Sequence, residues 1–216
     1  MRDAAKQDNR TVLYVSHNMN TIRQLCDRCI VLDKGKIIFD GDVEKAIQIY
    51  LGVDFESDYP VHYDLKRIDR LFQFGKEVLL TDFTFLNKQN AIFEVGEKIL
   101  FEIAVESHID VNDVQILVPI KDEDYNKIRM TFSQSFDLRK GEKKNIVFET
   151  TFNGLAHGIY VISVGLIKRG YAGQYYAYDD SGANILIELL NPQAYGLEWN
   201  KNYWGNVKFN DIVISN

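Results

Sequence analysis

The chain has 216 residues, of which 46% are hydrophobic and 26% charged, which is enough apolar material for one globular core and a smaller unit. The net charge of -6 argues against a nucleic-acid partner, because binding to phosphates relies on clustered Lys and Arg. No apolar stretch is long enough to cross a bilayer, Met1 to Arg10 is polar where a signal peptide would be apolar, and Cys26 and Cys29 are too few for a disulfide framework. We therefore expect a cytoplasmic protein.

The first fifty residues alternate strand and helix signals. The β-branched run Thr11 to Val15 predicts a buried strand, and Asn20 to Cys26 predicts a helix with one apolar face. Two further short strands, Arg28 to Asp33 and Lys36 to Phe39, are predicted to form a hairpin around Lys34-Gly35, followed by a helix that is capped by Asp42 and ended by Gly52.

From Lys76 onward the apolar residues recur with period two, which indicates strands. We predict a mainly β fold: an antiparallel immunoglobulin-like β-sandwich, preceded by a short α/β unit. Irregular residues 53–75 are predicted to be a linker with one turn of helix, between a unit at residues 1–52 and a sandwich at residues 76–216. The expected strands are 78–86, 98–106, 113–120, 127–132, 143–152, 158–167, 184–190 and 207–214.

The segment Thr11 to Leu51, TVLYVSHNMNTIRQLCDRCIVLDKGKIIFDGDVEKAIQIYL, resembles the last part of an ABC-transporter nucleotide-binding domain. The order of features carries the resemblance: an apolar strand ending in Ser16-His17, a helix, a second apolar strand ending in Leu32-Asp33, a Lys-Gly-Lys hairpin, then Gly41 and a helix. The resemblance implies that His17 is the switch histidine, which contacts the γ-phosphate and helps to orient the attacking water. Considered alone, His17 would be read as a polar residue at a strand end.

The rest of an ATPase site is not visible in this sequence. Neither Gly35-Lys36 nor Gly75-Lys76 belongs to a G-x-x-x-x-G-K-[ST] loop, and the signature loop of the family is missing as well. We therefore expect that this chain is not an enzyme by itself and holds no cofactor, whereas the longer subunit that it resembles would be an ATPase that uses ATP and Mg²⁺.

Two late segments of the chain are rich in tyrosine and tryptophan and are too polar to be core strands. Aromatic rings stack on the C–H faces of sugars, while Asp and Asn groups hydrogen-bond sugar hydroxyls, so such segments are suited to a glycan site. The same rings would also serve to close the ends of the sandwich or to form a subunit interface. The candidate carbohydrate-binding residues are Tyr175, Tyr176, Tyr178, Asp179, Asp180, Asn184, Trp199, Tyr203 and Trp204.

Other potential sites are less specific. Cys26 and Cys29 have C-x-x-C spacing, but the first Cys follows a helix instead of beginning one, so two structural thiols are expected. The acidic stretches at 110–113 and 179–182 lack EF-hand spacing and are expected to be turns. We predict no metal site.

An ATPase tail followed by a linker and a β-sandwich resembles the Wzt-type ATP-binding subunits of O-antigen, related polysaccharide and teichoic-acid ABC exporters. The resemblance implies that the C-terminal domain recognises the exported, undecaprenyl-linked polysaccharide and couples recognition to ATP-driven export. It implies a homodimer that binds the transmembrane subunit at the inner face of the cell membrane. Because Met1 precedes a sequence that lies deep within such an ATPase, we expect a shortened form of the subunit, either made for expression or encoded by a truncated reading frame.

Two alternatives stay open at this point. The sandwich would instead be a dimerisation or assembly domain without glycan binding, or a glycan-processing enzyme that uses Asp179, Asp180 and Glu198 as candidate carboxylates.

Overall fold

The computed structural model describes residues 11–16, 19–52, 59–68, 70, 74–171, 174–191 and 204–207. The chain divides into two compact units, Met1–Ser57 and Asp58–Asn216. Among the described residues, no helix has the length and apolar character needed to span a membrane.

The described residues of the first unit form two helices and a two-stranded antiparallel sheet. Helix α2 (Met19–Leu25) precedes β1 (Cys29–Asp33) and β2 (Lys36–Gly41), and helix α3 (Val43–Leu51) follows them. Lys34 and Gly35 have φ values of 47° and 79°, the left-handed pair that a type I′ hairpin requires. Asp42 caps α3 by accepting a 3.0 Å hydrogen bond from the Lys45 N–H, and Gly52 ends it with a φ of 64°. The predicted hairpin and capped helix are therefore confirmed.

The predicted strand at Thr11 to Val15 is wrong for this chain. Residues 11–16 form neither helix nor strand, and the side chains of Leu13 and Val15 are 88% and 95% exposed. A buried strand needs hydrogen-bonded neighbours, and no described strand of this chain pairs with this run.

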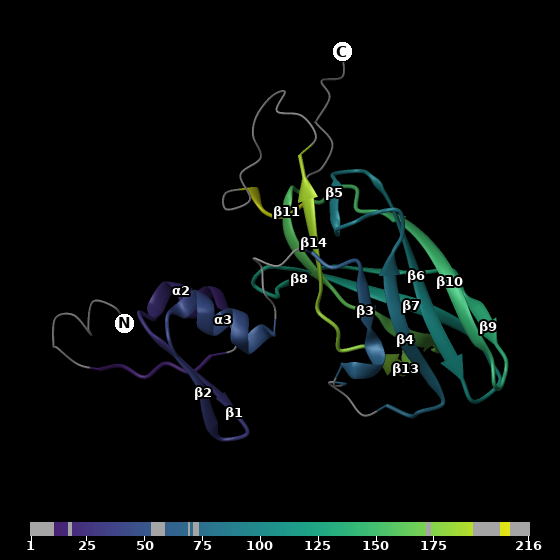
Figure 1. Ribbon diagram of the computed structural model, residues 1–216, viewed down its shortest axis with the longest axis horizontal. Coiled ribbons are helices and arrows are strands. Elements are labelled where there is room, and N and C mark those ends of the chain that lie inside the picture. Colours follow the sequence, from purple (N-terminus) through teal and green to yellow (C-terminus); the bar gives the residue numbers. More distant parts are fainter. Residues whose placement is uncertain are drawn as a thin grey trace, which may run out of the picture. The chain divides into compact units, whose positions relative to one another are not determined.

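The second unit is an antiparallel β-sandwich, with its two sheets stacked in Figure 1. One sheet has the strand order β10-β6-β4-β3, in which the strands are β3 (His62–Asp64), β4 (Val78–Phe85), β6 (Lys98–Ser107) and β10 (Lys143–Thr151). Strand β6 alternates fully, with Ile99, Phe101, Ile103 and Val105 buried, as its sequence predicted. The predicted mainly β class is therefore confirmed.

The other sheet has the order β13-β12-β7-β11-β14-β5, and β8 and β9 also pair with β7. Its strands are β5 (Ile92–Glu94), β7 (Val111–Asp122), β8 (Lys127–Phe132), β9 (Phe136–Leu138), β11 (Gly158–Ile162), β12 (Gly165–Arg169), β13 (Tyr175–Asp180) and β14 (Ile185–Leu190). Strands β11 and β12 keep one register along β7, from Tyr160↔Asp122 to Lys168↔Val114, so the single strand expected at 158–167 is interrupted only briefly. Among the described strands, β5 and β14 form the one parallel pair.

The core lies between the sheets and is rich in aromatic rings. Phe83 of β4 stacks on Phe101 of β6 at 5.3 Å between ring centroids, and Phe85 of β4 meets Phe93 of β5 at the same distance. The second contact joins the two sheets. Burial of rings and aliphatic side chains of this kind contributes about 2 kcal/mol each to folding.

Part of the expected linker belongs to the sandwich. Residues 59–67 supply β3, which pairs with β4, and a short 3₁₀ helix, η1 (Leu65–Arg67), whose Leu65 is fully buried. The sequence of this segment shows no strand pattern, because the three residues of β3 are too few for alternation to be visible. Of the last expected strand, 207–214, only Val207 is described, in a single bridge to Leu155, and the remainder lies outside the described residues.

Candidate functional site

Three of the predicted site residues, His17, Trp199 and Tyr203, lie outside the described part of the chain, and so does Glu198. The role of His17 as a switch histidine therefore stays a prediction. The structure describes the other seven predicted carbohydrate-binding residues, which are Tyr175, Tyr176, Tyr178, Asp179, Asp180, Asn184 and Trp204.

Tyr175, Tyr176 and Tyr178 lie on strand β13, which the sequence did not predict as a strand. The strand pairs with β12, with Tyr175 opposite Arg169 and Tyr176 opposite Lys168, and the register shifts between Leu166 and Ile167. Successive side chains of a strand point to opposite faces, so Tyr175 and Tyr176 lie on different faces of the sheet. The tyrosines therefore form two small sites.

On one face, Tyr175 lies opposite Arg169, whose side chain reaches the ring of Phe132. The guanidinium of Arg169 lies 4.6 Å from the ring centroid of Phe132 on β8, in a cation–π contact. Tyr175 is 60% exposed, and Phe132 and Met130 of β8 are exposed as well. Tyr175, Arg169 and Phe132 present two rings and a cation on paired strands, where the backbone fixes their positions.

On the other face, Tyr176 and Tyr178 form an edge-to-face pair with 4.8 Å between ring centroids. Burial raises the pKa of the Tyr178 hydroxyl, and the nearby Tyr176 and Glu77 raise it further. Tyr178 thus stays a neutral hydrogen-bond donor and acceptor at physiological pH. Tyr176 keeps 54% of its surface exposed.

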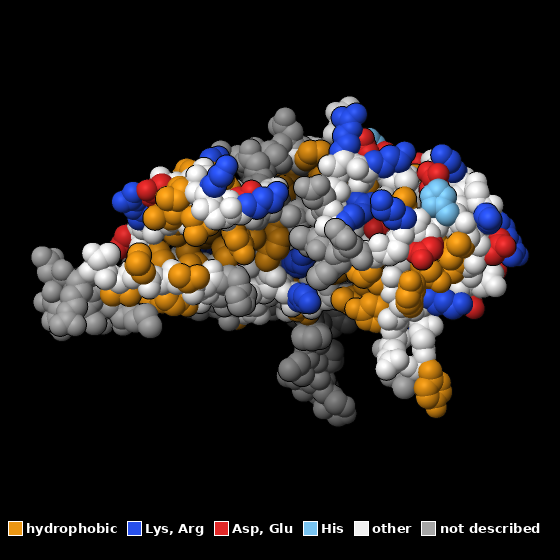
Figure 2. Space-filling view, turned by 90° about the horizontal axis from the view of Figure 1, so that it is seen from below, with side chains coloured by type: hydrophobic (Ala, Val, Ile, Leu, Met, Phe, Trp, Pro, Cys, Tyr) orange, Lys and Arg blue, Asp and Glu red, His pale blue; other side chains and the backbone are white. Residues whose placement is uncertain are grey.

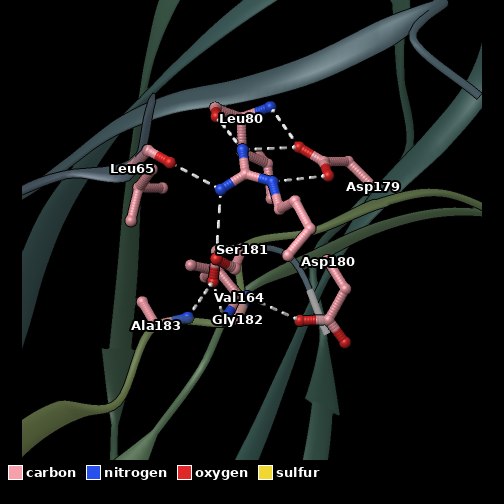
Figure 3. Close-up of polar contacts among 9 residues, drawn as sticks. Leu65, Leu80, Val164, Asp179, Asp180, Ser181, Gly182 and Ala183 are labelled. Carbon is pink, nitrogen blue, oxygen red and sulfur yellow. Dashed lines mark hydrogen bonds and ion pairs between the residues drawn. The ribbon is translucent and has the colours of Figure 1, made fainter. Parts of the chain in front are cut away.

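Asp179 is used inside the protein. Its side chain is 3% exposed and forms a two-pronged ion pair with Arg70, with Nε–Oδ1 at 3.0 Å and Nη2–Oδ2 at 3.1 Å. Oδ2 also accepts a 2.8 Å hydrogen bond from the Leu80 N–H. The guanidinium of Arg70 also donates to the carbonyls of Leu65, Ser181 and Leu80. Figure 3 labels these three residues and Asp179 around the dashed hydrogen bonds. This carboxylate is therefore turned away from any ligand at the surface.

Asp180 and Asn184 flank the turn that joins β13 to β14. The Oδ1 atom of Asp180 accepts a 3.1 Å hydrogen bond from the Gly182 N–H, as in the turn predicted for 179–182, and both side chains are half-buried. One oxygen of Asp180 is thus oriented by its own turn, while the carboxylate keeps contact with solvent.

Trp204 lies at the other end of the sheet from β13. Two residues beyond it, the Asn206 carbonyl accepts from the Ala156 N–H at 2.9 Å, and its side-chain amide donates to Asp122 at 3.3 Å. Ala156 comes just before β11 and β12, which together run along β7 from residue 158 to residue 169. Tyr175 pairs with Arg169, at the far end of this run. At 3.3 Å per residue the two ends are about 35 Å apart. Trp204 and Tyr175 therefore do not line one compact groove.

The sequence did not identify Arg169, Phe132, Met130 or Arg70. Phe132 and Met130 belong to an edge strand whose alternation predicts one wet face, and Arg169 resembles any polar strand end. Only the pairing of β13 with β12, of β12 with β7 and of β7 with β8 brings Arg169 and Phe132 near Tyr175. Hydrophobic side chains are visible on the surface of this protein in Figure 2.

The structure holds no evidence of redox chemistry at the C-x-x-C pair. Cys26 and Cys29 are free thiols, and burial, followed by the proximity of Cys26, raises the pKa of the Cys29 thiol. A redox C-x-x-C needs a lowered pKa, so two structural thiols explain the pair better. Within the described ranges, no group of three or more His, Cys, Asp or Glu side chains is arranged to hold a metal ion.

Known proteins share sequence with this chain over limited lengths. It is 26% identical over 95 residues to the oligopeptide transport ATP-binding protein OppF of Mycoplasma genitalium, and 33% identical over 64 residues to the phosphonates import ATP-binding protein PhnC of Maricaulis maris. The matches cover 41% and 27% of this chain, but they span only 11% and 24% of these two relatives. Both relatives are ATP-binding proteins, in agreement with the resemblance of Thr11 to Leu51.

The second unit has a relative of known structure and a matching family. The crystal structure of the C-terminal domain of Wzt superposes with a TM-score of 0.52 at 16% identity, covering 74% of this chain and 93% of that one, which shows a shared fold. Residues 75–197, more than half of the 216-residue chain, match the family described as the Wzt C-terminal domain. The chain therefore belongs to the Wzt C-terminal domain family.

Proposed function

We propose that the sandwich is a domain of the ATP-binding subunit of an ABC exporter and recognises an exported cell-surface polysaccharide through strand β13. The observation that carries the proposal is the group of exposed side chains formed by Tyr175, Arg169 and Phe132, which are linked by one strand pair and one cation–π contact. Tyrosine faces stack on sugar C–H surfaces, and the guanidinium donates to hydroxyl or anionic oxygens. Tyr176, Tyr178 and Asp180 would add contacts on the neighbouring face and turn.

Binding by such a surface is expected to be weak. Each ring adds about 1 kcal/mol, and sugar hydroxyls exchange hydrogen bonds with water for similar ones with protein. Affinity is therefore expected to be about micromolar or poorer for one domain, and to rise when two domains hold one polymer. Weak binding suits an exporter because it must release the polymer.

The remaining assignments concern the longer subunit. In our proposal it binds ATP and Mg²⁺, uses His17 at the γ-phosphate, forms a homodimer and docks on its transmembrane subunit at the inner face of the membrane. The polymer is linked to undecaprenyl at that stage. The support is the resemblance of Thr11 to Leu51 together with membership of the Wzt C-terminal domain family.

The geometry gives little support to a glycan-processing enzyme. Hydrolysis needs two convergent carboxylates, with one free to take or give a proton. Asp179 and Asp180 are neighbours on one strand, and both oxygens of Asp179 are bonded to Arg70. Such a pair does not converge on one ligand atom.

The test is equilibrium binding of the purified chain to surface polysaccharide extracted from the source cells, with the eluted polymer sized afterwards. We expect saturable binding without shortening of the polymer. Absence of binding, with the chain folded and self-associated, would favour the assembly domain, and shortened polymer would favour the enzyme.

A further inference from the structure

The segment that leads into the sandwich from the first unit is bonded along both sheets. The Tyr59 carbonyl accepts from the Ala91 N–H at 2.8 Å, and the Val61 carbonyl accepts from the Phe85 N–H at 2.7 Å. The Tyr63 hydroxyl accepts a 3.2 Å bond from the Leu186 N–H of β14, in the opposite sheet. The segment therefore depends on the relative position of the two sheets.

Arg70 closes this segment on β13. Besides the two bonds to Asp179, its guanidinium donates to the carbonyls of Leu65 at 2.5 Å, Ser181 at 3.0 Å and Leu80 at 2.7 Å. A guanidinium has five N–H donors, so these five hydrogen bonds use all of them. A lysine at this position would supply three donors from one nitrogen and would not reproduce the planar fork.

Strand β13 is held at few other places. It lies at the end of its sheet's strand order and pairs with β12, while its register shifts at the residues next to Asp179. Tyr175, Tyr176 and Tyr178 lie within four residues of Asp179. The position of the three rings is therefore set by β12 on one side, and on the other by Arg70 together with the Leu80 N–H of β4, which also bonds to Asp179.

We propose that the Arg70–Asp179 ion pair couples occupancy of the tyrosines on β13 to the order of segment 59–70, which continues toward the ATP-binding-like unit. The proposal rests on the proposed function, because it takes polysaccharide as the ligand of β13. Arg70 is a positioning residue that touches no ligand itself. Coupling between two sites is reciprocal, so a change that loosens the segment weakens binding, and binding tightens the segment by the same factor.

The experiment compares the full chain with three variants. Arg70→Lys keeps the charge and removes the fork, and Asp179→Asn keeps the shape and removes the charge. Arg67→Ala is the matched control, because Arg67 lies on the same segment, is 88% exposed and pairs with Asp64 at the surface. The probe is surface polysaccharide extracted from the source cells. The measurements are binding affinity and amide hydrogen exchange at Phe85, Ala91 and Leu186, whose N–H groups bond to segment 59–70.

We expect both Arg70→Lys and Asp179→Asn to weaken polysaccharide binding about fivefold or more, while Arg67→Ala leaves it unchanged. In the wild-type chain, polysaccharide should slow exchange at these three amides by the same factor, and in the two variants it should not. Folded Arg70→Lys or Asp179→Asn chains that bind as tightly as the wild type would overturn the coupling and leave the proposed function intact. A wild-type chain that does not bind at all would overturn both.

Discussion

Arg70 and Asp179 are 109 residues apart in the chain, yet their side chains share two hydrogen bonds, and Arg70 donates three more to backbone carbonyls. Removing one partner of a buried ion pair leaves the other charged and desolvated, which costs more than the pair contributes. At this scale the sequence could indicate that tyrosines cluster near Asp179. It could not indicate that Asp179 is buried, because its partner is distant and both residues are ordinarily found at surfaces.

Arg70→Ala should therefore lower the free energy of unfolding by about 3 kcal/mol, since the Asp179 carboxylate is left buried without its cation. Arg67→Ala, on the exposed side of the same segment, should change it by less than about 0.5 kcal/mol. Urea denaturation followed by circular dichroism measures both. Equal urea midpoints for the two variants would show that the buried Asp179 carboxylate is stable without the Arg70 cation.

Among the elements, those with a clear period were predicted well. The alternating β6 and the capped α3 match the sequence within a residue or two, because local pattern alone determines which face is buried. Strand β13 was missed because YYAYDD shows no alternation and its register shifts, and β3 was missed because it has three residues. The run Thr11 to Val15 has strand propensity but no partner among the described strands.

Segment 59–70 is thus expected to be an integral element of the sandwich. A chain that begins at residue 76 lacks β3, the buried Leu65 and Arg70. It should be several kcal/mol less stable than a chain that begins at residue 58, since one fully buried leucine contributes about 2 kcal/mol. Paired denaturation curves of the two fragments test this. Coincident curves would mean that the segment only lies on the surface.

On the scale of the whole molecule, the ATP-binding-like unit and the sandwich differ in burial. The first unit exposes Leu13, Val15 and Leu32, whereas β4 and β6 of the sandwich bury their alternating apolar residues. The family was predictable because the order of ATPase tail, connecting segment and β strands is present in the sequence. The ligand was not, because rings and amides identify a sugar-shaped partner without its linkage.

The purified chain should not hydrolyse ATP, because its sequence has no P-loop to hold the phosphates. Phosphate release with ATP and Mg²⁺ should equal that of the His17→Ala variant. Turnover by the wild type that disappears in this variant would contradict the prediction.

The homodimer also stays a prediction at this scale. The apolar residues 207–214, most of which lie outside the described range, are suited to pairing across a two-fold axis. Sedimentation equilibrium of a chain ending at residue 206 should give a monomer where the full chain gives a dimer. A truncated chain that remains dimeric would place the interface elsewhere.

The central claim is that the exposed tyrosines of β13 bind polysaccharide. Its most direct test is titration of the chain with polysaccharide from the source cells, for the wild type, the Tyr175→Ala/Tyr176→Ala double variant and Tyr50→Ala. Tyr50 lies on α3 and is 55% exposed, close to the 54% of Tyr176, so it controls for loss of an exposed ring. At about 1 kcal/mol per ring, the double variant should bind about thirtyfold more weakly, with Tyr50→Ala unchanged. A folded double variant that binds as tightly as the wild type would contradict the account.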